Sequence, residues 1–291
     1  MKRNIGERFF EKFNIILMCF LCVIMTYPML YVLFASLSDP AQFMAHKGLL
    51  IRPIGFSTIS YEMMAKNPTL LSGFFNTFFI LVVGVTLNII MTSFGAYFLS
   101  RKDAIGRSLI MKLIVFTMYF SGGTIPFYFV VMNLGLLDSY MSLILPGAIS
   151  TFNLIVMRTS FSAIPEVLIE SAKIDGAGHF RILFTIVMPL SKAIIAVMVL
   201  YYAVGHWNSW FNAMLFISSR DKYPLQLVLR EILISDDTAF MTQGADAGVK
   251  SMASYTVQYA VIIVSTLPML VIYPFVQKYF TKGVMVGAVK G

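Results

Sequence analysis

Long apolar segments without any charge dominate the pattern along this chain. Asp, Glu, Lys and Arg are absent from residues 13–38, 67–100, 113–137, 139–157, 193–219 and 251–277. About 20 mainly apolar residues make a helix long enough to cross a bilayer. We therefore predict six membrane-spanning helices near 14–35, 75–99, 112–132, 140–159, 187–210 and 254–276, in a single transmembrane domain covering residues 1–291. Asp138 alone separates the third window from the fourth, and with Gly135 it marks a tight helix hairpin.

The composition indicates a membrane protein. Of the 291 residues, 58% are hydrophobic and 12% are charged, whereas soluble domains carry roughly 25% charged residues. We therefore expect an all-α integral membrane protein. Cys19 and Cys22 both lie in the first apolar segment, which excludes a disulfide framework. That segment follows Lys2 and Arg3 as a signal peptide would, but its length and the five segments after it indicate a helix that is retained.

The net charge of +8 is distributed unevenly between the loops. Most Lys and Arg residues lie in segments 1–13, 100–112, 158–192 and 277–291, and the intervening loops are close to neutral. Because cytoplasmic loops are enriched in Lys and Arg, we predict cytosolic termini, a cytosolic loop at 160–186, and outer loops near 36–74 and 211–253. The basic excess is then an orientation signal that requires no nucleic acid.

Several functional classes are disfavoured by residues that the chain lacks. Ion-coupled carriers need ionisable groups inside their spans, and the only such group in the six windows is the imidazole of His206, which we interpret as a packing residue. The absence of an intramembrane Asp pair opposes an aspartyl protease. There is no GxxxxGK[ST] phosphate loop, no HExxH or Cys/His zinc pattern and no GxSxG elbow. We expect no catalytic or metal-binding residues, so any uphill transport must draw its energy from another subunit.

The inner loop over 162–190 contains a short amphipathic helix, which we place at 165–176. Pro165 suits a first helical turn, Glu166 favours the positive end of the helix dipole, and Gly176 is a typical helix stop. Glu170-Ser171-Ala172, Gly176 and Ile186-Val187-Met188-Pro189 follow at the spacing EAA-x3-G-x9-I-x-L-P. This pattern resembles the EAA loop of ABC importer permeases, with mild departures at Ser171 and Met188.

The resemblance extends over about residues 5–291 and is strongest to maltose-type carbohydrate permeases. It is carried by Asn76-Thr77, Ile174-Asp175-Gly176-Ala177, Trp207-Asn208, the run 223–230 and the C-terminal run 282–291. The last two are similar to a subgroup that takes up oligosaccharides, including alginate-derived ones. This resemblance implies a type I ABC importer permease fold with six transmembrane helices and a cytosolic coupling helix.

The same resemblance implies a set of partners in the bacterial cytoplasmic membrane. These are a second homologous permease in a heterodimer, two ATPase subunits that carry ATP and Mg, and an extracytoplasmic sugar-binding protein. This chain itself would bind no cofactor and would not be an enzyme.

By resemblance, the loop helix contacts an ATPase subunit through apolar side chains and a charge-assisted hydrogen bond from Glu170. The expected coupling residues are Val167, Leu168, Glu170, Ser171, Ala172, Ile174, Asp175 and Gly176. The alternative is a solvated linker helix. The tail 282–291 either reaches between the ATPase subunits or is an ordinary frayed end.

Aromatic rings and amides match the C–H faces and hydroxyls of sugars. The candidates along the substrate path are Asn88, Tyr97, Tyr119, Tyr128, Asn153, Trp207, Asn208, Trp210, Asn212 and Tyr259. The alternative for the two tryptophans is an aromatic belt at the membrane interface. In the acidic outer loop 235–250, Asp236, Asp237 and Gln243 are candidates for docking the binding protein, unless that loop is only a solvated connection.

Together these features predict the permease subunit of an ATP-driven oligosaccharide importer, forming half of the translocation pathway. The alternative is the same machinery carrying a polyol or glycerol phosphate. The windows hold no cation that could bind a free anion. We therefore expect a neutral glycan, or an acidic one whose charge is met by the partner permease or the binding protein.

Overall fold

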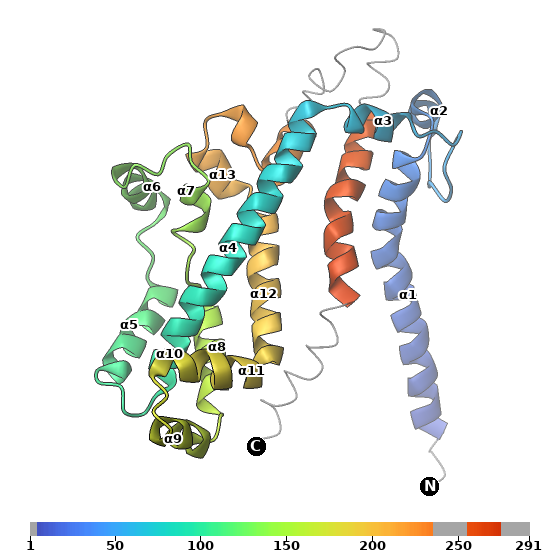
Figure 1. Cartoon of the computed structure of the whole chain (residues 1–291). Helices are drawn as coiled ribbons and strands as arrows, with labels where there is room; N and C mark the ends of the chain where they lie inside the picture. Colours follow the sequence, from blue (N-terminus) through green and yellow to red (C-terminus); the bar gives the residue numbers. More distant parts are fainter. Residues whose placement is uncertain (1–4, 235–254, 275–291) are drawn as a thin grey trace. The chain divides into compact units, whose positions relative to one another are not determined.

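The computed structural model describes residues 5–234 and 255–274 (Figure 1). Regular structure in these ranges is helical, apart from an isolated bridge between Ser38 and Phe56. The chain divides into two compact units, Met1–Pro68 with Glu231–Leu267 and Thr69–Arg230 with Pro268–Gly291.

The helices of the first unit are α1 (Ile5–Ser36), α2 (Pro40–Ala45), α3 (Ile59–Ala65) and most of helix Tyr255–Pro274. The second unit holds nearly all of the rest. Its helices are α4 (Pro68–Ser100), α5 (Arg107–Tyr119), α6 (Thr124–Asn133), α7 (Met141–Ile144), α8 (Thr151–Ser162), α9 (Glu166–Ile174), α10 (His179–Ile182), the π-helical η1 (Leu183–Val187), α11 (Met188–Leu190), α12 (Lys192–Trp207), α13 (Phe211–Phe216), the 3₁₀ turn η2 (Arg220–Lys222) and α14 (Leu225–Ile234).

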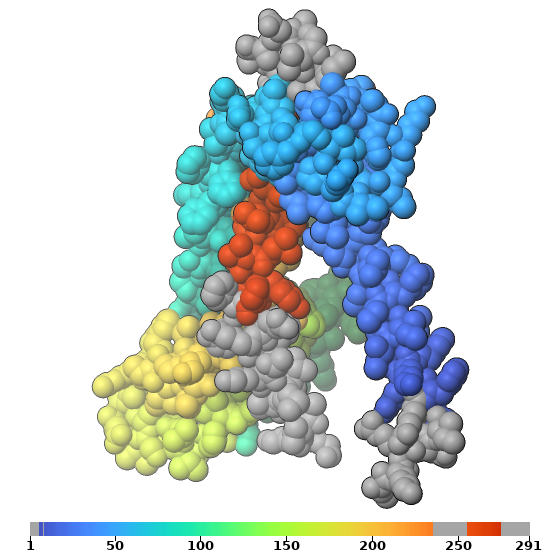
Figure 2. Space-filling model, turned by 90° about the vertical axis from the view of Figure 1, so that its right-hand side faces the viewer, coloured from blue at the N-terminus to red at the C-terminus, as the bar shows by residue number. Residues whose placement is uncertain are grey.

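The first unit is built on two long apolar helices. The ring of Tyr31 in α1 lies edge-on to Phe43 of α2 and to Tyr259, with centroids 6.4 and 6.1 Å apart. The Ser60 hydroxyl of α3 donates to Thr256 Oγ1 at 2.8 Å. The N-terminal half of α1 is largely exposed, and Figure 2 shows it standing clear of the neighbouring helix. An apolar helix exposed on all sides is typical of a membrane span.

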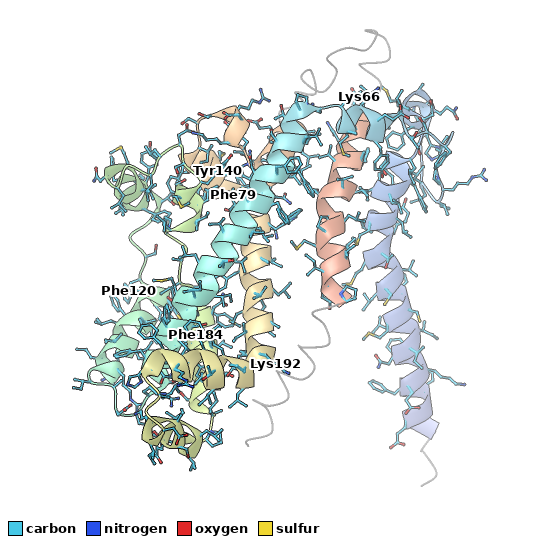
Figure 3. All side chains as sticks on the ribbon, in the orientation of Figure 1. Lys66, Phe79, Phe120, Tyr140, Phe184 and Lys192 are labelled. Atoms are coloured by element: carbon cyan, nitrogen blue, oxygen red, sulfur yellow. The ribbon has the colours of Figure 1, made fainter. Side chains whose placement is uncertain are left out.

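Two buried clusters hold the second unit together. One joins α4, α8, α9 and α12 around Tyr97, Phe161, Ile169 and Met198, and we call it the α9 cluster. The other joins α4, α6, α7, α13 and α14 around residues that include Phe216. Beside this second cluster, Phe79 of α4 packs on Tyr140 with ring centroids 5.4 Å apart (Figure 3).

Three helices are long and apolar enough to cross a membrane alone: Phe9–Ser36, Pro68–Ser100 and Tyr255–Pro274. Three further pairs reach that length only together. They bend by 119° between α5 and α6, by 74° between α8 and α9, and by 88° between the His179–Leu190 stretch and α12. The described residues therefore allow up to six spans, in agreement with the six predicted segments.

The structure differs from the prediction in where the spans are broken. The expected span at 112–132 is interrupted between α5 and α6, where Gly122 and Gly123 disfavour helix. The expected span at 140–159 is interrupted between α7 and α8, because Pro146 lacks a backbone N–H and Gly147 adds conformational freedom. The expected span at 187–210 becomes the separate helix α12 after the bend at Ser191.

Candidate functional site

Helix α9 has sharply defined ends. Pro165 precedes it, Glu166 lies in its first turn and Lys173 in its last, so both charges complement the helix dipole. At the C-terminal end Gly176 adopts a φ of +76°, which favours glycine. The N–H of Gly176 donates to Lys173 O at 3.0 Å and that of Ala177 to Ala172 O at 2.9 Å. This is a Schellman motif, and it ends the helix at the position that the sequence predicts.

One face of α9 is buried within its own chain. Ile169 and Ala172 belong to the α9 cluster, and Ala172 is only 9% exposed. The prediction that Ala172 contacts an ATPase subunit therefore meets a structure in which this methyl faces inward, because residues three apart share one face of a helix. The apolar side chains that do point outward are Val167 (68% exposed), Leu168 and Ile174 (86%). Glu170, Ser171, Asp175 and Gly176 are also exposed.

Two ion pairs attach α9 to the loop that follows α4. Lys102 Nζ lies 2.9 Å from Glu166 Oε2, and Lys173 Nζ lies 3.0 Å from Asp103 Oδ2. The hydrogen bond from Lys102 holds the pKa of Glu166 below its ordinary value, and the hydrogen bond from Lys173 does the same for the pKa of Asp103. Exposed pairs of this kind contribute little stability individually. Their position at both ends of α9 fixes the direction of the helix.

A buried arginine anchors the same loop to the spans. Arg101, at the end of α4, donates from Nη2 to Phe161 O at 3.3 Å, and its guanidinium carbon lies 5.3 Å from the centre of the Tyr97 ring. Arg158 of α8 donates from Nε to Leu99 O at 3.2 Å. Helices α4 and α8 are therefore joined where they approach α9, so a displacement of α9 is transmitted to both.

The structure places four sugar-path candidates in the interior: Asn88, Tyr97, Asn153 and Trp207. Asn88 donates to Gly147 O and Ala148 O, and its Oδ1 lies 2.7 Å from His206 Nε2. The Tyr97 hydroxyl lies 3.1 Å from His179 Nδ1, and the Trp207 ring lies edge-on to Phe74. These polar groups and rings are engaged in holding the helices together, so they are not open to a sugar.

The other candidates retain accessible surface. Tyr119 is 80% exposed, and Asn208, Trp210 and Asn212 are exposed in succession around the end of α12 and the start of α13. The Asn208 amide donates to Val204 O, and the Arg230 guanidinium carbon lies 4.8 Å from the centre of the Trp210 ring. Tyr128 is half-buried and stacks on Phe216. Tyr259 lies in the first unit with Tyr31 and Phe43.

The unwound segment between α7 and α8 is satisfied by side chains from other helices. Besides the two bonds from Asn88, the N–H of Ser150 donates to the Tyr202 hydroxyl at 3.0 Å, and that hydroxyl lies 2.7 Å from Thr92 Oγ1. Non-helical backbone at membrane depth is tolerated only when its polar groups are satisfied in this way. Asn88 and Thr92 are four residues apart on α4, so their spacing in the sequence signals a shared face.

Asp138 is a structural residue that the sequence marks only as a turn. It adopts a φ of +53° and accepts hydrogen bonds from the N–H groups of Ser218 and Ser219 and from the Ser219 hydroxyl. Lys222 Nζ donates to Asp138 Oδ2 at 2.8 Å and to Asp138 O at 2.7 Å. These bonds, that from Lys222 foremost, hold the pKa of Asp138 well below its usual range. The hairpin is thereby tied to the segment that precedes α14.

Some predictions lie outside the described residues. The docking candidates Asp236, Asp237 and Gln243 and the tail 282–291 are among them. Within 5–234 and 255–274, no group of three or more His, Cys, Asp or Glu side chains is placed to hold a metal ion.

A scan against models of protein families finds no match. Two relatives from Bacillus subtilis (strain 168) are 41% identical over the whole of this chain: Protein LplC, 98% of which is covered, and the polygalacturonan/rhamnogalacturonan transport system permease protein YtcP, 100% of which is covered. The crystal structure of a bacterial ABC transporter involved in the import of the acidic polysaccharide alginate matches with a TM-score of 0.88 at 30% identity, over 96% of this chain and 99% of that chain. The chain thus belongs to the permeases of ABC importers, the membrane-spanning subunits of these uptake systems.

Proposed function

We propose that this chain is the permease subunit of an ABC importer for oligosaccharides. It forms half of the translocation pathway in a heterodimer with a second, homologous permease. Two ATPase subunits bind ATP and Mg and supply the energy, and an extracytoplasmic binding protein delivers the sugar. This chain binds no cofactor and catalyses no covalent reaction.

The observation that carries this proposal is the two-sided packing of α9. Its inner face is part of the α9 cluster with α4, α8 and α12, whereas its outer face leaves Val167, Leu168 and Ile174 exposed beside Glu170. Clustered apolar side chains on an otherwise polar surface mark an interaction site. A helix that contacts an ATPase on one face and the spans on the other passes a movement from one to the other.

The substrate class is supported by the relatives. One full-length relative is named for polygalacturonan and rhamnogalacturonan, and the matching structure concerns import of alginate, described there as an acidic polysaccharide. Acidic glycans are therefore favoured over a polyol or glycerol phosphate. The six charge-free windows offer no fixed cation, so we assign recognition of the carboxylates to the partner permease or to the binding protein.

In the transport cycle, closure of the two ATPase subunits draws the coupling helices of the two permeases together. The spans then change from inward-facing to outward-facing as rigid bodies. The protein resides in the bacterial cytoplasmic membrane with both termini in the cytosol. The loop containing Asp236, Asp237 and Gln243 meets the docked binding protein, and the tail 282–291 reaches towards the ATPase subunits.

The test is transport by the complete complex carrying Glu170→Ala or Gly176→Pro. Removing the Glu170 carboxylate should weaken ATPase binding roughly tenfold or more, as for other charged interface pairs. Proline cannot adopt the φ of +76° found at Gly176, so that variant should disrupt the end of α9. Gly178→Pro is the matched control, because Gly178 has a φ of −72° that proline adopts.

Both variants should insert into the membrane normally and lose sugar uptake together with ATPase co-purification. Normal uptake in both would refute the assignment of α9. A wild-type complex that imports no oligosaccharide would refute the substrate class.

A further inference from the structure

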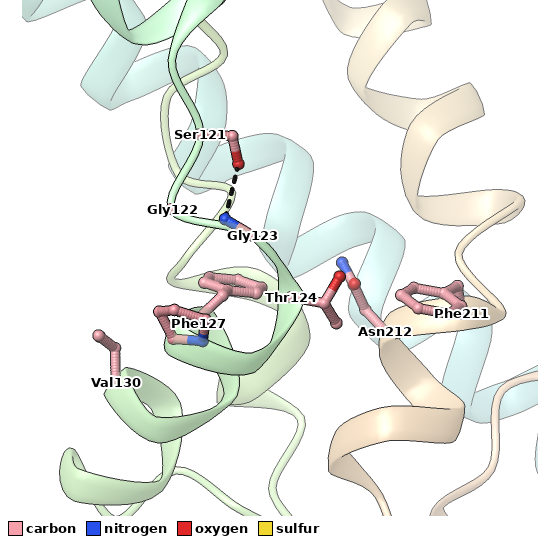
Figure 4. A pocket seen from close by; sticks show the side chains of 9 residues that line it. Ser121, Gly122, Gly123, Thr124, Phe127, Val130, Phe211 and Asn212 are labelled. Atoms are coloured by element: carbon pink, nitrogen blue, oxygen red, sulfur yellow. Dashed lines mark hydrogen bonds between the residues drawn. The ribbon is translucent and has the colours of Figure 1, made fainter.

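The break between α5 and α6 opens a cavity of about 450 Å³ beside the start of α13 (Figure 4). The chain turns by 119° here, and Gly123 adopts a φ of +85° that favours glycine. The lining includes Ser121, Thr124 and Phe127 from the break and the first turn of α6, and Phe211 and Asn212 from α13. All of these residues belong to the second compact unit.

Two polar side chains in this cavity have no hydrogen-bond partner among the described residues. They are the Thr124 hydroxyl and the Asn212 amide, which point towards one another from the two sides of the cavity in Figure 4. Ser121 accepts the N–H of Gly123 at 3.2 Å and keeps its own hydroxyl proton for another partner. Several hydrogen-bonding groups are therefore left available in one small volume.

The position of the break in the sequence makes these free groups informative. Residues 113–137 form one of the charge-free windows, so the break lies within a membrane segment. An unpartnered amide or unwound backbone facing lipid would carry a large desolvation cost. Such groups are tolerated where they line a polar cavity, and interrupted helices form the substrate sites of many transporters.

The remaining lining determines the kind of ligand. Phe211 is 44% exposed, and the half-buried Phe127 is held edge-on to Phe216 with centroids 5.5 Å apart. No charged side chain lines the cavity. Neutral donors and acceptors beside aromatic faces match the hydroxyls and the C–H face of a sugar ring. The volume lies in the lower part of the range of about 300–1,000 Å³ for small-molecule sites.

We propose that this cavity is a subsite for one ring of the transported glycan. Thr124 and Asn212 hydrogen-bond to its hydroxyls, Phe127 and Phe211 lie against its C–H face, and any carboxylate remains outside the cavity. This inference rests on the proposed function. It adds a sugar site on this chain itself, formed by a helix break rather than by the buried amides and rings of the spans.

The first test is sugar uptake by proteoliposomes containing the complete transporter and its binding protein. The probes are an oligogalacturonide, an alginate oligosaccharide and raffinose, and the one that wild type imports is used throughout. Asn212→Leu and Thr124→Val should each raise the KM for uptake roughly two- to tenfold, the range for one lost hydrogen bond. Asn212→Gln should recover part of the loss.

Matched controls come from the same pair of helices. Asn133→Leu removes an exposed amide of α6 outside the cavity, and Thr117→Val removes a hydroxyl of α5 that donates to Ile114 O. Both should transport like wild type. If Asn212→Leu and Thr124→Val also transport like wild type, the subsite is wrong. If wild type imports none of the three sugars, the proposed function fails instead.

A second measurement does not depend on transport. Thr124→Cys, with Cys19 and Cys22 replaced, should react with a maleimide in the assembled complex, and a saturating concentration of the imported sugar should slow that reaction severalfold. Thr117→Cys should show no such protection. Equal labelling of Thr124→Cys with and without sugar would overturn the proposal even if the other variants fail to fold.

Discussion

Gly84 and His206 form a steric pair between α4 and α12 that permits a quantitative test of the packing. A Cβ atom added at Gly84 would lie 2.6 Å from His206 Nε2 and 2.8 Å from Cε1. The Gly84→Ala variant must therefore displace the imidazole. Because the same Nε2 lies 2.7 Å from Asn88 Oδ1, the displacement also breaks that hydrogen bond.

The magnitude follows from three contributions. Overpacking costs about 1–3 kcal/mol, and a hydrogen bond between membrane helices averages about 0.6 kcal/mol. Replacing glycine by alanine in a helix recovers up to about 1 kcal/mol. Gly84→Ala should therefore lower the free energy of unfolding by about 1–3 kcal/mol. In a His206→Ala background the added methyl group enters vacated space, so the same change should be close to neutral.

Thermal unfolding of the detergent-solubilised complex, followed by tryptophan fluorescence, measures this double-mutant cycle. The two changes should show a coupling energy of about 1–3 kcal/mol, within the range for residues in contact. Gly95→Ala is the matched control on α4, since its Cβ would meet only the tip of Leu154, which can move. Additive effects of Gly84→Ala and His206→Ala would refute the close approach of the two helices.

Three further predictions concern charged residues outside the spans. Bonding to Lys222 lowers the pKa of Asp138, so this contribution to stability is present above the unfolded-state pKa of about 3.9 and is lost as the pH falls towards the folded-state value; Asp138→Asn should reduce the acid sensitivity of the unfolding temperature, and an unchanged pH profile would contradict this. Lys102→Glu and Glu166→Lys should each reduce transport-coupled ATP hydrolysis, and the double variant should restore it unless the pair does not position α9. A cysteine at Asp237, in a background without native cysteines, should be labelled from outside intact cells; labelling only after lysis would invert the predicted topology.

The candidate site was predicted unevenly from the sequence. The loop helix could be placed closely because its signals are local: Pro165 and Glu166 begin it and Gly176 ends it. The inward position of Ala172 was missed because it depends on which face of α9 packs against the spans. The Gly122-Gly123 pair and Pro126 do signal the break between α5 and α6, but an apolar window by itself predicts a continuous helix.

The sequence by itself determined the properties that a short stretch of chain can encode. Charge-free length indicates the spans, Lys and Arg bias indicates their predicted orientation, and the spacing from Glu170 to Pro189 indicates the coupling loop. Only the tertiary structure decided which polar side chains of the spans face one another. Asn88 bonds to Gly147, 59 positions away, and to His206, 118 positions away. Such pairings depend on how separate helices pack, so no pattern within one helix distinguishes an amide that joins two helices from one, like that of Asn212, that opens into a cavity.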